Sequence, residues 1–453
     1  MINKIIFLAI MILLCSIEKA QFKDNDTLLF TSGIASSNTT AYSPHNSAEL
    51  NKEKEPLLLN LLQRSNLSDD WWGIRNNLSE SGLDFEFVYK GEMFSNIYGG
   101  IDRATTTLDN IDVILLANLG KSFGWENTNF LIHFLGNSGA APNELVGASQ
   151  GISNIEATPT WKLYQFLIEK KFFEEQFSIA TGLYDLNSEF DVRETSCIFI
   201  NPSHGIGAEI AKSGLNGPSI FPTTSVAVRL KFESESGNYI QTAILDGVPG
   251  DPKNPYGTHI IFDRNEGLLL IAELGIVKSE NEQLNSKIAF GAWTYTSNFD
   301  KNNFEGGSKN IISLKKNYGF YLTAEKLLAA NFENLNKNLS GFLRIGYANK
   351  ITNPIDFYFG AGFKCRCLFS GRDEDELGVA FALSHNSSVF RNTTAMLEDM
   401  IIKSYEINLE ATYSFHLTQW LKIQPDIQYI INPAYCSKSK TAFVMGSRIQ
   451  LII

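Results

Sequence analysis

The sequence predicts an all-β protein, a 16-stranded antiparallel transmembrane β-barrel of the outer membrane with a short N-terminal helical lead-in. Three observations support this prediction. Polar and apolar residues alternate every second position along much of the chain, the candidate strands are even in number, and long and short segments alternate between them. A period of two gives a strand one apolar and one polar face. An even strand number and loops sorted by length are typical of outer-membrane barrels.

The N-terminal part of the chain precedes the predicted barrel. Lys4 is followed by an apolar run over 5–15 that is too short to span a bilayer, so we expect residues 1–20 to be a secretory signal peptide. The next segment, 21–67, is polar and contains the charged run KEKEP, which is typical of a flexible lead-in.

A short helix is expected over residues 68–82, SDDWWGIRNNLSESG. Asp69 or Asp70 can cap its N-terminus, and Gly82 can end it. After residue 15 the chain has no run of 18 apolar residues, which excludes a helical membrane protein.

The region 83–453 is expected to form the barrel, because it shows strand patterns and no convincing long helix. The sixteen candidate strands are 83–98, 107–120, 127–137, 160–172, 176–187, 222–234, 237–248, 265–278, 286–297, 314–327, 338–349, 354–366, 375–387, 401–415, 419–432 and 439–452. Many of them have nine residues or more, the length that a tilted membrane-spanning strand requires.

The clearest alternation lies in YEINLEATYSFH, which begins at Tyr405. Its apolar stripe runs from Tyr405 to Phe415, ten residues later. At roughly 3.3 Å per residue this is about 33 Å of strand. A tilt of about 40° reduces the height to about 25 Å, the thickness of the lipid-facing band of a barrel. We therefore expect this face to contact lipid, and Glu406, Asn408 and Glu410 to face water inside the barrel.

The connections between the strands indicate the sidedness of the barrel. Long gaps at 138–159, 188–221, 249–264, 298–313 and 388–400 alternate with tight ones at 174–176, 234–236 and 416–418. A short gap near Lys350 and a longer one at 328–337 are exceptions. Outer-membrane barrels place long loops outside and short turns in the periplasm, whereas a soluble sandwich has no reason to sort its loops in this way.

Composition argues against several other classes. A net charge of -11 makes a nucleic-acid partner unexpected. Five cysteines are too few for a disulfide framework, although a bridge between Cys197 and Cys436 stays open. The six histidines show no metal-binding spacing, so neither a metal nor another cofactor is expected, and the chain is not expected to be an enzyme.

From about Trp71 to near its end, the chain resembles the carbohydrate-selective porins of the OprB family. The segments that carry the resemblance are WWGIRNNLSESGLDFEFVYKGEMFSNIYGG (71–100), LGNSGAAPNELVGASQGISNIEA (135–157), LYDLNSEFD (183–191), SGLNGPSIFP (213–222), LDGVPGDPKNPYGTHI (245–260) and LKIQPDIQYIINP (421–433). The resemblance implies a 16-stranded outer-membrane barrel through which glucose and other small saccharides diffuse. The chain departs from the usual outer-membrane pattern at its end, where LII stands in place of an aromatic residue.

A sugar-selective pore needs aromatic faces and hydrogen-bonding groups of both charge signs. The predicted inward faces supply both signs, including Glu92, Arg229, Lys231 and Arg344. The gap 188–221 is rich in Gly and Pro and is expected to fold inward and narrow the lumen. The candidate substrate-binding and constriction residues are Asp185, Asn187, Glu189, Asp191, Arg193, Asn154, Glu156, Trp161, Arg229, Lys231 and Glu92.

Other interpretations stay open at this stage. The acidic residues of the long loop could instead be solvated or bind structural calcium. The barrel could be a general or ion-selective porin, or a structural barrel with a plugged lumen. The expected partners are small saccharides and outer-membrane lipid, and both a monomer and a homo-oligomer fit the sequence.

Overall fold

The computed structural model describes residues 64–281, 284–300, 314–330, 337–369, 371–397, 401–433 and 441–453. The predicted signal peptide, 1–20, and most of the polar segment 21–67 lie outside these ranges. Cys436 also lies outside them, and with it the bridge to Cys197.

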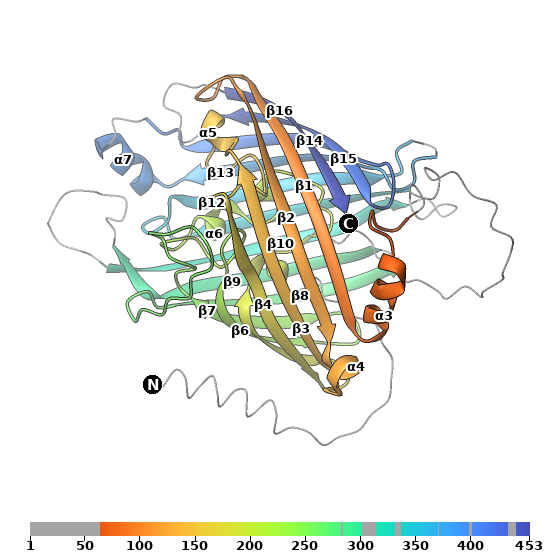
Figure 1. Ribbon diagram of the computed structural model, residues 1–453. Helices are drawn as coiled ribbons and strands as arrows, with labels where there is room; N and C mark the ends of the chain where they lie inside the picture. Colours follow the sequence, from red (N-terminus) through yellow and green to blue (C-terminus); the bar gives the residue numbers. More distant parts are fainter. Residues whose placement is uncertain are drawn as a thin grey trace.

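Sixteen antiparallel strands form one closed barrel, in which β1 pairs with both β2 and β16 (Figure 1). The strands are β1 (Leu83–Tyr98), β2 (Thr105–Asn118), β3 (Thr128–Gly139), β4 (Thr160–Phe172), β5 (Phe177–Tyr184), β6 (Ser225–Glu233), β7 (Tyr239–Asp246), β8 (Leu268–Asn281), β9 (Leu284–Asp300), β10 (Leu314–Ala330), β11 (Asn338–Ala348), β12 (Ile355–Arg366), β13 (Glu376–Asn386), β14 (Tyr405–His416), β15 (Leu421–Ile431) and β16 (Thr441–Ile452). The predicted fold class is confirmed.

Each predicted strand corresponds to an observed one, with ends that differ by four residues at most. The differences have local causes. The fifth strand was expected to reach residue 187 but ends at Tyr184, because the Asp185 side chain accepts a hydrogen bond from the Asn187 backbone and starts a 3-10 turn, η2 (Leu186–Ser188). Such Asx turns compete with the extended backbone.

The remaining helical elements are short. They are η1 (Trp71–Gly73), α3 (Ile74–Glu80), α4 (Leu119–Phe123), α5 (Asn143–Val146), η3 (Pro202–His204), α6 (Ala208–Ala211) and α7 (Ser388–Leu397). In Figure 1, α3, α4 and the C-terminus lie at one end of the barrel, and α7 lies at the other. No helix in the described part of the chain is both long and apolar enough to cross a membrane.

The N-terminal helix closes the seam between the first and last strands. Gly73, and not Asp69 or Asp70, occupies the N-cap position of α3, but the Asp70 side chain accepts a hydrogen bond from the Asn76 backbone in its first turn, at 2.9 Å. Arg75 stacks on the Trp71 ring at 4.4 Å and donates to the carbonyl of Ile453 at 2.9 Å. The helix therefore fastens the C-terminal end of β16 to the start of the barrel.

Strand β14 shows the two predicted faces. Leu409 is 42% exposed on the outer face, whereas Glu406, Asn408 and Glu410 are at most 1% exposed on the inner face. The direction of both faces is thus confirmed. The expectation that the inner polar residues face water is wrong, because two loops fold into the barrel and cover them.

We name these loops the first inner loop, residues 140–159, and the second inner loop, residues 185–224. Both carry apolar side chains that pack against the inner wall and form the core of the molecule. Leu186, Phe190, Ile206 and Ile210 of the second inner loop belong to a cluster with Leu245, Ile271, Trp293 and Tyr321 of the wall. Val146 and Ile152 of the first inner loop belong to a cluster with Phe94, Ile430 and Val444. Burying such side chains stabilises each loop inside the lumen.

Candidate functional site

Wall carboxylates hold the first inner loop through pairs of backbone N–H groups. Glu406 on β14 accepts hydrogen bonds from the backbones of Ser149 at 2.7 Å and Gln150 at 3.0 Å. Two successive N–H groups that point at one carboxylate form charge-assisted bonds, which are roughly twice as strong as neutral ones. They also satisfy backbone donors that would otherwise be buried without partners.

Carboxyl groups of the wall also hold the second inner loop at three places, by a pair of backbone N–H groups at one and by a single N–H group at each of the other two. Glu410 on β14 accepts from the backbones of Ile200 and Asn201, at 2.6 and 3.1 Å. On the opposite part of the wall, Glu325 on β10 accepts from Thr195 and Glu273 on β8 accepts from Asp191, both at 2.9 Å. The loop therefore lies inside the lumen and contacts the wall from β8 to β14, which confirms its predicted inward folding.

A buried ionic cluster links the second inner loop to β11. Arg344, which is fully buried, contacts Glu209 on α6 through two bonds of 2.6 Å and Asp191 through a bond of 3.0 Å. Arg193 makes a second ion pair with Asp191. Gly207 lies so close to this cluster that a Cβ atom there would come within 1.8 Å of the guanidinium, so a side chain at this position would displace Arg344.

A second buried pair links the first inner loop to the barrel seam. Glu92 on β1 accepts a hydrogen bond from Arg448 on β16 at 2.6 Å and another from the Ser153 hydroxyl at 2.6 Å. The same arginine donates to the side-chain oxygen of Asn154. Like Arg344, Arg448 serves to hold a loop, because its hydrogen bonds go to protein groups.

The lumen contains a cavity of about 340 Å³ next to the start of the second inner loop. Inward residues of β3 to β6 form its wall, the start of the second inner loop covers one side, and the turns at 174–176 and 234–235 border it. The lining residues that bear charge or a hydroxyl are Glu169, Lys171, Glu174, Glu175, Ser178, Tyr184, Ser188, Glu189, Arg229, Lys231, Glu233, Ser234 and Glu235. This volume is at the lower end of the roughly 300–1,000 Å³ that is common for small-molecule sites. We call it the lumenal pocket.

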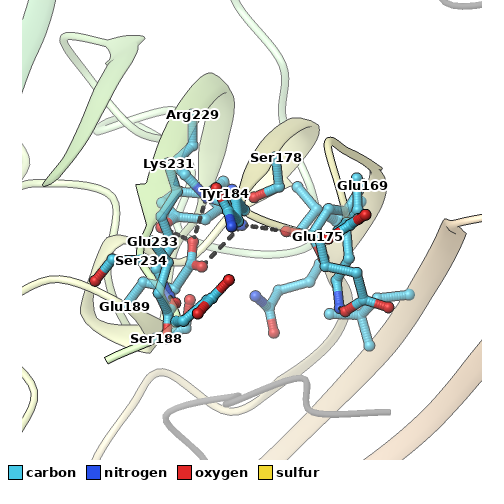
Figure 2. Close-up of a pocket in the computed structure, with 17 residues that line it drawn as sticks. Glu169, Glu175, Ser178, Tyr184, Ser188, Glu189, Arg229, Lys231, Glu233 and Ser234 are labelled. Atoms are coloured by element: carbon cyan, nitrogen blue, oxygen red, sulfur yellow. Dashed lines mark hydrogen bonds and ion pairs between the residues drawn. The ribbon is translucent and has the colours of Figure 1, made fainter. Parts of the chain in front are cut away.

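Arg229 lies at the centre of the lumenal pocket (Figure 2). Its guanidinium donates to both oxygens of Glu189 at 2.8 Å and to Glu169 at 2.7 Å. Tyr184 donates its hydroxyl to the same Glu189 carboxylate. Burial alone would raise the pKa of Glu189, but the Arg229 guanidinium holds that pKa below its usual value. Glu189 therefore stays charged and keeps the start of the loop on the wall.

The structure divides the predicted site residues into two groups. Three of them, Glu189, Arg229 and Lys231, line the lumenal pocket together. The others hold the loops: Asp185, Asn187, Asp191, Arg193, Asn154, Glu156 and Glu92 make hydrogen bonds to backbone or side chains of the inner loops and the wall. The polar residues of this second group form protein contacts that shape the lumen.

Trp161 is a correction. It was expected near the constriction, but its side chain is 60% exposed and points outward, over Gly136. The cause is a β-bulge in β4, where His133 pairs with Gln165 and Phe134 with Leu163, so that Tyr164 is the extra residue. A bulge of one residue exchanges the two faces of a strand beyond it. Counting every second residue from Glu169 therefore gives the wrong face for Trp161.

Among the carboxyl groups of the inner loops, Asp185 and Glu156 have pKa values raised to near neutrality. Burial raises the pKa of Asp185 to about 6, while its hydrogen bonds from Tyr164 and Asn187 oppose this. Burial also raises the pKa of Glu156 to about 7, against the hydrogen bond from the Asn143 backbone. Both groups lie at points where an inner loop turns.

Sequence reasoning missed several residues of the site. Glu169 and Lys171 share the inner face of the predicted strand 160–172, so the period of two could have identified them. Glu209 lies in an irregular loop, where no period indicates the direction of a side chain. Only the fold brings it to Arg344, 135 residues away in the chain.

The comparisons with known families and curated proteins agree with one another. The model of the carbohydrate-selective porin, OprB family, matches residues 102–451. Porin B of Pseudomonas aeruginosa is 24% identical over 412 residues, which cover 84% of this chain and 90% of that protein. The putative porin QuiX of Acinetobacter baylyi is 23% identical over 414 residues, which cover 85% of this chain and 92% of that protein.

Solved structures show the same fold. The high-pH structure of Pseudomonas putida OprB superimposes with a TM-score of 0.75 at 21% identity, over 86% of this chain and 99% of that chain. The low-pH structure of the same protein gives a TM-score of 0.57 at 20% identity, with the same coverage.

Proposed function

The chain belongs to the OprB family of carbohydrate-selective porins, and from this premise we propose that small neutral saccharides diffuse through its barrel along a path that includes the lumenal pocket. The family consists of outer-membrane channels, so flux follows the sugar gradient. The observation that carries the proposal is a polar pocket of about 340 Å³ beneath a loop that fills much of the lumen.

Polar groups, rather than aromatic stacking, are proposed to recognise the sugar at this point. Tyr184 is the aromatic residue among those lining the pocket, and it is only 1% exposed. Sugar hydroxyls can donate to the carboxylates and accept from Lys231. A site on a diffusion path must also release its ligand quickly. We therefore expect binding at roughly millimolar strength, about -4 kcal/mol.

The outer face of the barrel is proposed to contact outer-membrane lipid. Large apolar side chains are exposed there on many strands, among them Phe290, Phe320, Leu409, Ile427 and Met445. They alternate with inward polar residues, as a lipid-facing wall requires.

A planar-bilayer experiment tests the sugar path. Added glucose should partly block the ion current in a concentration-dependent way. The variant Lys231→Met should raise the half-blocking concentration about five-fold, the equivalent of about 1 kcal/mol for one lost hydrogen bond. Its ion-pair partner Glu233 has a 43% exposed side chain, so loss of the lysine leaves no buried charge.

Lys170→Met is the matched control. Lys170 lies on β4, next to the pocket residue Lys171, but its own side chain donates to the Glu126 carbonyl and does not line the pocket. The variant Lys170→Met should leave the block by glucose unchanged. A current that sugars never modulate, in a channel that conducts ions normally, would contradict the proposed path. A liposome-swelling panel of sugars against amino acids then separates a sugar channel from a general porin.

A further inference from the structure

The lumenal pocket carries an excess of negative charge. Six glutamates, Glu169, Glu174, Glu175, Glu189, Glu233 and Glu235, line it together with three cations, Lys171, Arg229 and Lys231. The barrel wall around it has a low dielectric constant, and a cleft in which one sign of charge predominates concentrates the field of the excess charge. The pocket is thus an electronegative section of the path.

None of the three cations is available to neutralise an incoming anion. Arg229 is already held between Glu169 and Glu189. Lys171 pairs with Glu175 and Lys231 pairs with Glu233, each at 2.6 Å. In contrast, Glu174 and Glu235 have no ion-pair partner among the residues that the structure describes. Two of the three excess negative charges therefore lie at the turns that border the pocket, and the third lies where Glu169 and Glu189 share Arg229.

The backbone of one of these turns supports a functional role for its glutamates. Phe173, Glu174 and Glu175 have φ angles of 53°, 54° and 68°, in the left-handed region. Glycine or asparagine is favoured there, and other residues are uncommon. Two adjacent glutamates in such a turn go against local preference, and backbone strain of this kind clusters at functional sites. The turn places one paired and one unpaired carboxylate at the border of the pocket.

We propose that this pocket is a charge filter, which admits neutral and cationic sugars and disfavours acidic ones such as uronates, aldonates and sugar phosphates. This inference rests on the proposed sugar path, and it adds the class of solute that the path rejects. The same filter makes the channel conduct small cations in preference to anions. The determining residues are Glu174 and Glu235, because each of the other four glutamates of the pocket contacts a cation.

The first test measures the reversal potential in a planar bilayer under a KCl gradient at low ionic strength, where charges are least screened. The wild-type channel should be cation-selective. In the variant Glu174→Gln/Glu235→Gln, the permeability ratio of K⁺ to Cl⁻ should fall about four-fold for each carboxylate removed. A unit negative charge about 8 Å away in water changes the local concentration of K⁺ and of Cl⁻ about two-fold each, in opposite directions. Glutamine keeps the size and backbone preference of glutamate, so folding should be unaffected.

The control variant is Glu80→Gln/Glu126→Gln, which removes two carboxylates from the same end of the barrel but outside the pocket. It should leave the permeability ratio at the wild-type value. A wild-type channel that prefers Cl⁻, or an equal effect of both double variants, would overturn the charge filter.

The second test compares liposome swelling with glucose, glucosamine and glucuronate. Glucuronate should enter several-fold more slowly than the other two, and the pocket variant should narrow that difference. If glucose and glucuronate enter equally fast, the charge filter is wrong while the sugar path stands. If no sugar enters, the sugar path is wrong, and the reversal potential still decides whether the pocket selects ions by charge.

Discussion

Replacing Arg344 by methionine should release the second inner loop from the wall. The guanidinium is fully buried and contacts both Glu209 and Asp191. Without it, Asp191 keeps its ion pair with Arg193, but Glu209 becomes a buried carboxylate without a cation. Breaking a buried pair in this way costs about 3–5 kcal/mol, because an uncompensated charge stays in the interior.

The expected result is a wider channel in a barrel that still folds. The sixteen strands keep their own hydrogen-bond ladder, whereas the loop loses one of its attachments across the lumen. Single-channel conductance and the size limit for sugars should rise, and amides of residues 185–224 should exchange with solvent faster. The double variant Arg344→Met/Glu209→Gln should recover part of the loss, since it leaves no buried charge behind.

Arg366→Met is the matched control on the adjacent strand β12. Its ion pair with Glu374 is at the surface, where the glutamate side chain is 58% exposed. Such pairs contribute about 0–1 kcal/mol, so conductance and loop exchange should stay as in the wild type. If Arg344→Met also leaves both unchanged, the ionic cluster does not hold the loop and the reasoning fails.

Three further predictions concern the outer face, the second inner loop and pH. Leu409→Arg should cost about 2–4 kcal/mol and abolish the heat-modifiable gel band, whereas Leu409→Phe should assemble; equal bands would refute the face assignment. Deletion of 195–215 should raise conductance and weaken size discrimination between saccharides, and an unchanged size limit would place the loop outside the path. Burial raises the pKa of Glu156 from 4.5 to about 7. The contribution of this carboxyl group to the stability of the folded first inner loop is therefore fully present below pH 4.5 and is lost as the pH rises to about 7. Hydrogen exchange of the first inner loop should therefore accelerate between pH 4.5 and about 7, and Glu156→Gln should remove this pH dependence. If the variant shows the same pH profile as the wild type, the role of Glu156 is refuted.

The sequence by itself determined the fold class, the strand order along the chain and the faces of most strands. These properties are local. The period of two in β14 and β15 depends only on the alternating direction of successive side chains. The alternation of long and short gaps likewise needs no knowledge of which strands are neighbours. The inward folding of the second inner loop also followed from its length and composition.

The tertiary structure alone decided which charges meet and which of them remain accessible. Arg344 and Glu209 are 135 residues apart, and Glu410 reaches the Ile200 backbone across 210. The inward folding of the second inner loop within the closed barrel brings each pair together, and nothing in the local pattern encodes the partner. The bulge at Tyr164 similarly turned Trp161 outward, because it arises from pairing with β3. Which side chains meet depends on the tertiary structure of the barrel and its inner loops. For this reason, most of the residues that were predicted from the sequence to contact sugar instead hold the loops in place.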